Sequence, residues 1–249
     1  MKSILYTCLL ISPFLFISSC KKNIEGCMDS SAINYNSEAT TNNNSCLFDS
    51  DGDGIYDSDE IFGCTDSLAC NFDINATDDN SNCVYSEPGY DCAGHLTAQV
   101  GDEFQGGILI YIDVTGEHGL IAAYENLPGL YEWGCYGINL NSTNNLGYEN
   151  SLYISQNCET ETGEITAAQA AIDYENEGYL DWYLPNKSQL GLLHLANEGG
   201  IINFDGEYWS STQVNIDKSW MIIAGIGGGG ECYSHLKYSL HSVYPIRSF

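Results

Sequence analysis

Regularly spaced carboxylates are the feature of this sequence that most clearly could do chemistry. From Asp49 to Glu60 the segment DSDGDGIYDSDE places acidic side chains at loop positions one, three, five, nine and twelve, with Gly54 at position six. Calcium takes about six to eight oxygen ligands, and this alternation lets the backbone curl around one ion while the glycine makes the sharp turn. The predicted ligands are Asp49, Asp51, Asp53, Ile55 through its carbonyl, Asp57 and Glu60.

The alternative interpretation of this segment is a solvated acidic loop without a metal. No amphipathic helix flanks it, because Cys46 and Cys64 lie close by, so the segment resembles a type-three thrombospondin calcium repeat more than a complete EF-hand. That resemblance implies a structural calcium site and no buried regulatory switch. Calcium is the cofactor that we expect.

The acidic loop lies between two copies of an internal repeat. GCMDSSAINYNSEATTNNNSC, from Gly26, aligns without gaps with GCTDSLACNFDINATDDNSNC, from Gly63, at a constant offset of 37 residues. The copies resemble the short GC-T-D-x-x-A-C-N-Y-N modules of secreted and surface proteins from gliding and polymer-degrading bacteria, which are inferred to be spacers or stalks. We therefore expect residues 26–92 to form an acidic, cysteine-rich stalk.

The two copies differ in their cysteines. Cys70 and Cys92 align with Ile33 and Ile55, so two cysteines are missing together from the first copy. Loss of one disulfide partner would leave a stray thiol, and the joint absence therefore predicts a bond between Cys70 and Cys92. The remaining cysteines would then pair as Cys27–Cys46 and Cys64–Cys83. Sequence alone permits other connectivities.

The amino-terminal segment has the character of a signal peptide. Its apolar run, Ile4 to Ile17, follows a short positive start and is too short to span a membrane. The run ends in ISSC at Cys20, which resembles the lipobox of bacterial lipoprotein precursors. The resemblance implies removal of residues 1–19, acylation of Cys20, and anchoring at either face of the outer membrane with 20–25 as a tether. The alternative is an ordinary secretory signal that is cleaved nearby.

The charge balance excludes nucleic acid as a partner. Lys and Arg number 7 against 34 Asp and Glu, and none of the cationic residues lies between Asn23 and Asn186. Such a surface repels phosphate backbones and sulfated glycans, whereas it attracts divalent cations. The 11 cysteines favour an oxidising, extracytoplasmic compartment.

The composition changes after residues 93–101, a nearly uncharged segment that we expect to be a linker. Beyond it, apolar and β-branched runs alternate with turn residues, and Asn186 with Gln189 three residues on predicts the N-terminal capping box of a helix. We predict strands over 107–113, 118–123, 207–212, 219–226, 232–238 and 243–247, and helices over 164–175 and 186–197. The fold class is therefore α+β.

Four tryptophans, all in this region, predict a compact core with a partner for each indole N–H: Trp133, Trp182, Trp209 and Trp220. The segment DWYLPNKSQL is expected to be mainly structural. Pro185 and Asn186 set a turn into a helix, and Leu190 faces the core.

The motifs GDEFQGGILIYID, HGLIAA, EWGCYG, GYLDWYLPNKSQLGLL, EYWSST, SWMI and YPIRSF, in this order, resemble the Lcl C-terminal family across residues 102–249. That family is regarded as C-type-lectin-like and occurs at the ends of surface proteins, including collagen-like adhesins that bind host glycans. The resemblance implies binding and no catalysis. The sequence lacks the Glu-Pro-Asn, Gln-Pro-Asp and Trp-Asn-Asp tripeptides of the usual C-type lectin sugar site, which argues against calcium-bridged sugar binding by that route.

Aromatic residues in Gly- and Asn-rich loops are the candidate ligand contacts: Tyr131, Trp133, Tyr136 and Tyr233. Three cysteines lie in the same region. We expect Cys135 to pair with Cys158, with Cys232 left free or paired between chains.

The sequence favours a lipid-anchored, non-catalytic binding or adhesion protein for a glycan or an envelope ligand. The alternative is a structural subunit of an envelope assembly. An enzyme is the third hypothesis: no zincin histidine spacing or Gly-x-Ser-x-Gly elbow is present, although a carboxylate pair for glycoside hydrolysis would be invisible among 34 acids. GIGGGG from Gly225 matches a dinucleotide fingerprint, but no helix is expected to follow it.

Overall fold

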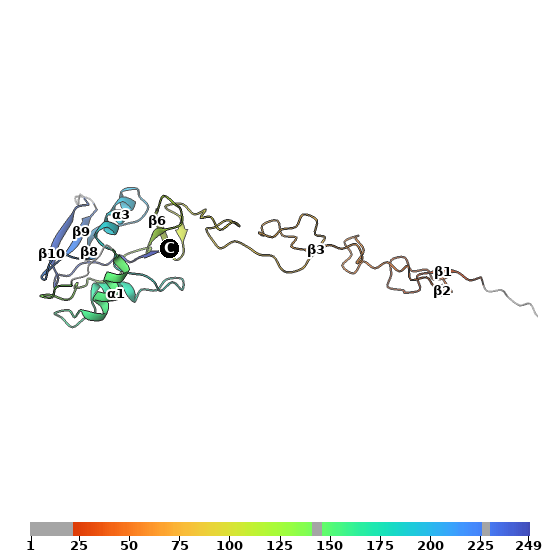
Figure 1. The fold of residues 1–249 in the computed structure, drawn as a ribbon, viewed down its shortest axis with the longest axis horizontal. Helices are drawn as coiled ribbons and strands as arrows, with labels where there is room; N and C mark the ends of the chain where they lie inside the picture. The colour runs from red at the N-terminus through yellow and green to blue at the C-terminus, as the bar shows by residue number, and fades with distance from the viewer. Residues whose placement is uncertain (1–21, 141–145, 226–229) are drawn as a thin grey trace, which may run out of the picture. The chain divides into compact units, whose positions relative to one another are not determined.

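The computed structural model describes residues 22–140, 146–225 and 230–249. The chain divides into two compact units, Met1–Val84 and Tyr85–Phe249 (Figure 1). The predicted signal segment 1–19 and Cys20 lie outside the described residues, as does most of GIGGGG. In the part of the chain that the structure describes, no helix has the length and apolar character needed to cross a membrane.

The two copies of the repeat form equivalent backbone units in the first region. β1 (Glu25–Gly26) pairs in parallel with β2 (Thr41–Asn42), and β3 (Phe62–Gly63) pairs in parallel with β4 (Asp78–Asp79). The offset of 37 residues between the copies is therefore retained in their strand pairing.

Covalent cross-links hold each repeat together. Two disulfide bonds have the pairing expected from the repeat, Cys27–Cys46 and Cys64–Cys83. Cys70 and Cys92 are each disulfide-bonded as well, and their pairing with one another stays a prediction. Cross-links of this kind supply stability that so small a unit cannot obtain from apolar burial alone.

One exposed asparagine in each repeat bonds to the backbone of a later part of that repeat. The Asn34 amide donates to the carbonyl of Ser45 at 2.5 Å, and its oxygen accepts from the backbone N–H of Leu47 at 2.8 Å. Asn71, at the equivalent place in the second copy, makes the same two kinds of bond. Both side chains thus pair backbone groups that no strand satisfies.

The second unit combines two antiparallel sheets with three helices in its described residues. One sheet has the order β11-β7-β6-β5, from β5 (Glu103–Phe104), β6 (Gly107–Ile112), β7 (Gly119–Ala122) and β11 (Ile246–Ser248). The other has the order β10-β9-β8, from β8 (Gly206–Gln213), β9 (Lys218–Ala224) and β10 (Cys232–Leu236). The helices are α1 (Gly147–Asn157), α2 (Ala167–Ile172) and α3 (Lys187–Glu198). This mixture, mostly sheet with a few helices, agrees with the α+β class.

Local signals in the sequence account for several of these elements. β6 and β7 form the predicted hairpin. The predicted capping box of α3 is present, because Asn186 Oδ1 accepts from the Gln189 N–H at 2.9 Å and Gln189 Oε1 accepts from the Asn186 N–H at 2.9 Å. α2 is shorter than predicted, since the Thr166 side chain caps it and its helix begins only at Ala167.

Helix α1 was not predicted. Its N-cap, Leu146, makes no side-chain capping bond, and its buried face consists of Gly147, Asn150, Ser151 and Ile154 instead of an apolar stripe. Ser151 fixes the helix through a polar contact, since its Oγ donates to the Leu184 carbonyl and accepts from the Leu184 N–H. Neither capping residues nor apolar periodicity therefore indicate this helix.

Three of the four tryptophans lie in the core, as predicted. Trp133, Trp182 and Trp209 are each 0% exposed. The core prediction is wrong for Trp220, which is only half-buried. Lys187 Nζ lies 3.3 Å from the centre of its ring. The alternation of β9 buries its neighbours Ser219 and Met221 and turns Trp220 to the opposite face of the strand.

The segment expected to be a linker, 93–101, is folded as part of the second unit, which starts at Tyr85. Tyr90 forms an antiparallel bridge with Leu96, and Leu96 and Ala98 pack against the hydrophobic core.

Candidate functional site

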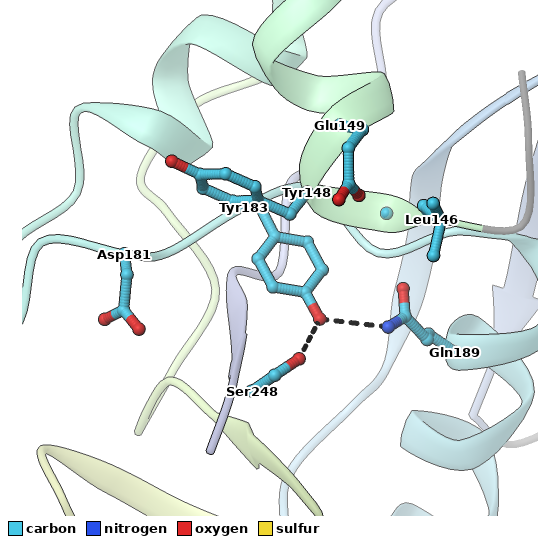
Figure 2. A pocket seen from close by; sticks show the side chains of 8 residues that line it. Leu146, Tyr148, Glu149, Asp181, Tyr183, Gln189 and Ser248 are labelled. Atoms are coloured by element: carbon cyan, nitrogen blue, oxygen red, sulfur yellow. Dashed lines mark hydrogen bonds between the residues drawn. The ribbon is translucent and has the colours of Figure 1, made fainter. Parts of the chain in front are cut away.

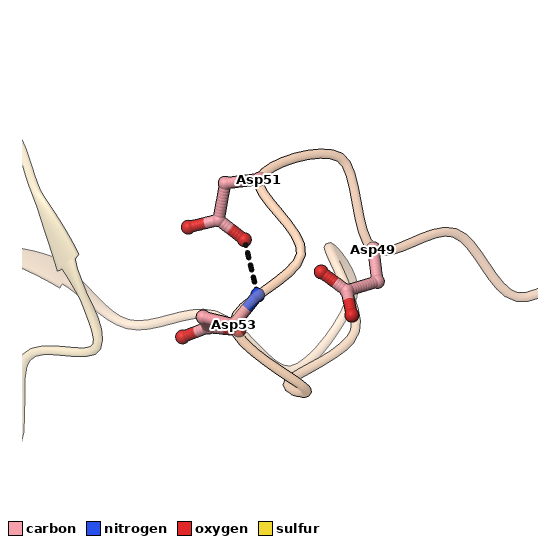
Figure 3. A group of neighbouring side chains, drawn as sticks. All are labelled: Asp49, Asp51 and Asp53. Atoms are coloured by element: carbon pink, nitrogen blue, oxygen red, sulfur yellow. Dashed lines mark hydrogen bonds between the residues drawn. The ribbon is translucent and has the colours of Figure 1, made fainter.

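The acidic loop of the first unit gathers three of the predicted calcium ligands. Carboxylate oxygens of Asp49, Asp51 and Asp53 lie within 4.8 Å of one another (Figure 3). Asp49 accepts from the backbone N–H groups of Gly52 at 2.7 Å and Gly54 at 3.1 Å. Both glycines have positive φ, +82° and +96°, which lets the backbone turn tightly enough for the carboxylates to converge.

A second acidic group shares Asp51 and includes a residue that the loop spacing did not indicate. Asp51, Glu60 and Asp78 also bring carboxylate oxygens within 4.8 Å of one another. Asp78 belongs to β4, in the second repeat, where the first repeat has Thr41. That exchange between the copies was the one sequence signal for it. Desolvation, and after it the charge of Asp78, raises the pKa of Glu60.

The two remaining predicted ligands behave differently. Asp57 belongs to neither group: it accepts from the backbone N–H and the hydroxyl of Ser50, both at 2.7 Å, although its charge also contributes to the raised pKa of Glu60. The backbone N–H of Ile55 donates to Asp53 at 2.7 Å, and a role for the Ile55 carbonyl stays a prediction.

One of the four aromatic residues predicted to contact a ligand, Trp133, is instead buried in the core of the second unit. Trp133 is 0% exposed and its indole N–H donates to the Ser210 carbonyl at 2.7 Å, so it is a core residue. Tyr131 is half-buried, and its hydroxyl donates to the backbone carbonyl of Pro128. Tyr136 and Tyr233 are exposed. None of the four lines the cavity formed around Tyr183.

This cavity, of about 390 Å³, is the candidate ligand site, and we call it the Tyr183 pocket (Figure 2). It is lined by Leu146, Gly147, Tyr148, Glu149, Asp181, Tyr183, Gln189 and Ser248. The lining comes from the start of α1, the segment before α3, α3 itself and β11, which are far apart in the sequence.

The side chains of the motif DWYL, residues 181–184, alternate between the pocket and the core. Asp181 and Tyr183 line the pocket, whereas Trp182 and Leu184 are 0% exposed and belong to the core. Tyr183 is itself only 3% exposed and packs in the core, so the structural role predicted for this motif holds for Trp182, Tyr183 and Leu184. The pocket-lining half was missed, because sequence alone does not show that α1 and β11 meet it.

The pocket is floored by a hydrogen-bonded set of neutral groups. The Tyr183 hydroxyl lies 2.6 Å from Ser248 Oγ and accepts from Gln189 Nε2 at 3.0 Å (Figure 2). Burial is the main cause of the raised pKa of Tyr183, and the charges of Glu149 and Asp181 add to it. Tyr183 thus stays a neutral phenol.

Close approach at the start of α1 requires a glycine. A Cβ added to Gly147 would collide with Gln189 Oε1 and the ring of Tyr183. Tyr148, the next residue, is 42% exposed and contacts Tyr183 edge-to-face, with ring centres 5.9 Å apart. The first turn of α1 thus places the Tyr148 ring against the Tyr183 ring at the pocket.

Asp181 is held in place by a buried arginine. Arg247 Nε and Nη2 donate to its two carboxylate oxygens at 2.7 and 2.9 Å, and Arg247 also donates to Gln105 Oε1 at 2.8 Å. The guanidinium lies 4.2 Å from the ring centre of Tyr179. Such bidentate pairing fixes the carboxylate and neutralises its charge locally.

A buried lysine fixes the loop that carries the disulfide Cys135–Cys158, which forms as predicted. Lys237 is 0% exposed, and its ammonium donates to the carbonyls of Cys135 and Ile138 and to Gln213 Oε1, each at 3.0 Å. Burial lowers the pKa of Lys237 to about 8. Among the residues that the structure describes, Cys232 has no disulfide partner.

Comparisons with known proteins assign no family. No protein-family model matches the sequence, and no curated protein matches it significantly. A fimbrial protein from Bacteroides ovatus is similar in structure with a TM-score of 0.40 and 14% identity, over 70% of this chain and 50% of that protein. The chain thus spans about half the length of that protein. A likeness of this degree carries no argument about fold or function.

Proposed function

We propose that this chain is a lipid-anchored, extracytoplasmic binding protein without catalytic activity, whose second unit holds a glycan in the Tyr183 pocket. Three features of the sequence support the location: the signal-like start, the lipobox resemblance at Cys20 and the 11 cysteines. Disulfide bonds in both units agree with an oxidising compartment. The anchor would lie at the outer membrane.

The observation that carries the proposal is the lining of the pocket. Tyr148 offers a partly exposed aromatic face for the C–H face of a sugar ring, while Asp181 and Glu149 offer acceptors for hydroxyl groups. Asp181 is a fixed acceptor, since Arg247 engages both of its oxygens. A carboxylate held in a fixed position can accept hydrogen bonds from the hydroxyl groups of a bound ligand, as a binding site requires.

The order of motifs that resembles the Lcl C-terminal family supports a C-type-lectin-like fold for the second unit, which we include in the proposal. The pocket is not lined by Tyr131, Tyr136 or Tyr233, and in this proposal it holds a sugar without a metal.

The test is glycan-array binding by the full chain, purified in detergent, and by two variants. Tyr148→Ala removes the exposed ring of the pocket and is expected to lower binding about tenfold or more, as loss of one aromatic contact in a small-ligand site does. Tyr153→Ala is the matched control, because Tyr153 is also exposed on α1 (44% against 42%) but does not line the pocket. Equal binding by both variants would contradict the proposal.

For the first unit we propose a stalk stiffened by calcium at the shared acidic groups. Convergent carboxylates repel one another, and a divalent cation relieves that repulsion. Asp51→Asn removes the residue common to both groups and should abolish the calcium-induced protection of the loop from proteolysis. Asp59→Asn, in the same loop but in neither group, should retain it. Protection by calcium that is equal in both variants would refute the site.

A structural role within an envelope assembly is the second candidate. It is favoured by apolar side chains that the first unit leaves in solvent: Phe62 at 66%, Leu68 at 82% and Ile74 at 83% exposure. Reproducible co-purification of one envelope protein, lost on Leu68→Ser and Ile74→Ser and unaccompanied by glycan binding, would favour this role.

A further inference from the structure

The charge of the Tyr183 pocket is set by Glu149. Asp181 is neutralised by Arg247, whereas the Glu149 side chain forms no hydrogen bond or ion pair among the described residues, although it lines the same cavity. It lies in the first turn of α1, where a negative charge interacts favourably with the helix dipole. The pocket therefore presents one carboxylate that has no cationic partner among the described side chains.

No cation of the second unit is placed to receive an anionic ligand there. Lys187 lies over the ring of Trp220, Lys237 is buried among carbonyls, and Arg247 is paired. None of these residues lines the pocket, and neither does Lys218 of β9. A sulfated or carboxylated sugar would have to bring its charge beside Glu149 without a counter-ion.

The pocket offers hydroxyl groups as well as acceptors to a ligand. The Gln189 amide donates to Tyr183, and one of the hydroxyls of Tyr183 and Ser248 donates to the other, which leaves one hydroxyl hydrogen of that pair over. Tyr148 brings a further hydroxyl to the lining. The charged groups are the two carboxylates, which Figure 2 shows on different sides of the Tyr183 ring, so a ligand with separated donors fits them.

We propose that Glu149 is a specificity-determining residue that makes the pocket prefer a sugar bearing a free, protonated amine over its N-acylated or acidic counterparts. This inference rests on the proposed glycan-binding function. The ammonium would pair with Glu149, the pocket carboxylate that has no ion-pair partner among the described residues. The hydroxyls of the same sugar supply the other donors.

The test compares two probes that differ only in acetylation, a glucosamine tetrasaccharide and its fully N-acetylated form. Binding to the full chain is measured by calorimetry at a pH where the amine is protonated. We expect the amine form to bind about fivefold more tightly, the effect of roughly 1 kcal/mol. Added salt should reduce the ratio, because the pair is exposed.

Glu149→Gln keeps the size of the side chain and removes its charge. It should bring the ratio of the two affinities to about one, because the charge that distinguishes the amine probe from the acetylated probe is gone. Glu175→Gln, an exposed substitution of the same kind outside the pocket, should keep the preference of the parent protein.

The outcomes separate this inference from the function on which it rests. Equal binding of both probes by the parent protein overturns the role of Glu149 and leaves glycan binding intact. Loss of the preference in Glu175→Gln, or its retention in Glu149→Gln, also overturns that role. Binding of neither probe, with other array glycans also unbound, overturns the proposed function. A tetralysine peptide that binds as tightly as the amino sugar shows that charge alone is recognised, which overturns the sugar class.

Discussion

The two units of this chain hold their backbones by different means. Among the described residues of the first unit, 22–84, the buried apolar side chains are few: Cys27, Ala32, Cys64 and Ala69. Disulfides and asparagine side chains hold the rest of its backbone. The second unit surrounds its three buried tryptophans with two hydrophobic clusters. A region without a core keeps its acidic side chains at the surface, whereas a core can position a pocket from distant segments.

This contrast predicts that the largest effect of one substitution falls in the second unit. Trp182→Ala removes a fully buried ring and should lower the free energy of unfolding by about 3–5 kcal/mol. Urea unfolding followed by tryptophan fluorescence measures it, because all four tryptophans lie in this unit. Trp220→Ala, at a half-buried site, should cost clearly less. An equal decrease in the free energy of unfolding for both variants would show that burial in the core does not determine the stability of this unit.

Breaking a cross-link should instead act on the first unit alone. Replacing Cys64 and Cys83 together by serine removes the constraint on a loop with a sequence separation of 19 residues, which is worth about 3 kcal/mol. Limited proteolysis should then cleave the second repeat much faster. The fluorescence-detected unfolding of the second unit should stay unchanged, and a matching loss there would refute the division of roles.

A smaller effect should appear with pH through Lys237. Its pKa is about 8 in the folded protein, below the usual 10.5, so between these values the unfolded chain holds a proton that the folded chain has lost. The free energy of unfolding should therefore rise with pH, by roughly 1–2 kcal/mol from pH 8 to pH 10. Above this range the buried tyrosines Tyr208 and Tyr244, whose pKa values are raised by burial, act in the opposite direction.

Two substitutions isolate this contribution. Lys237→Met should remove the rise with pH, whereas Lys218→Met, at a half-buried position of β9, should keep it. Urea denaturation at several pH values provides the measurement. The same slope in Lys237→Met as in the parent protein would assign the pH dependence to another group.

The sequence predicted what neighbouring residues determine. The capping box of Asn186 and Gln189, the β6–β7 hairpin and the disulfides Cys27–Cys46 and Cys64–Cys83 all follow from local spacing or internal comparison. Helix α1 escaped prediction because its buried face is polar and its start uncapped.

Long-range contacts account for what the sequence did not indicate. Trp133 is in a loop by composition, but its indole N–H reaches Ser210, 77 positions away. Asp78 joins the acidic loop from the second repeat. The Tyr183 pocket needs α1, α3 and β11 together, and no spacing along the chain shows that these meet.

The most direct test of the account is a backbone-amide NMR titration of the protein with the glycan that the array identifies. We predict that chemical shifts change at residues 147–149, 183, 189 and 248, around the Tyr183 pocket, and stay constant in the first unit. Changes centred on Tyr136 or Tyr233, or on the repeats, would place recognition elsewhere and contradict the central claim.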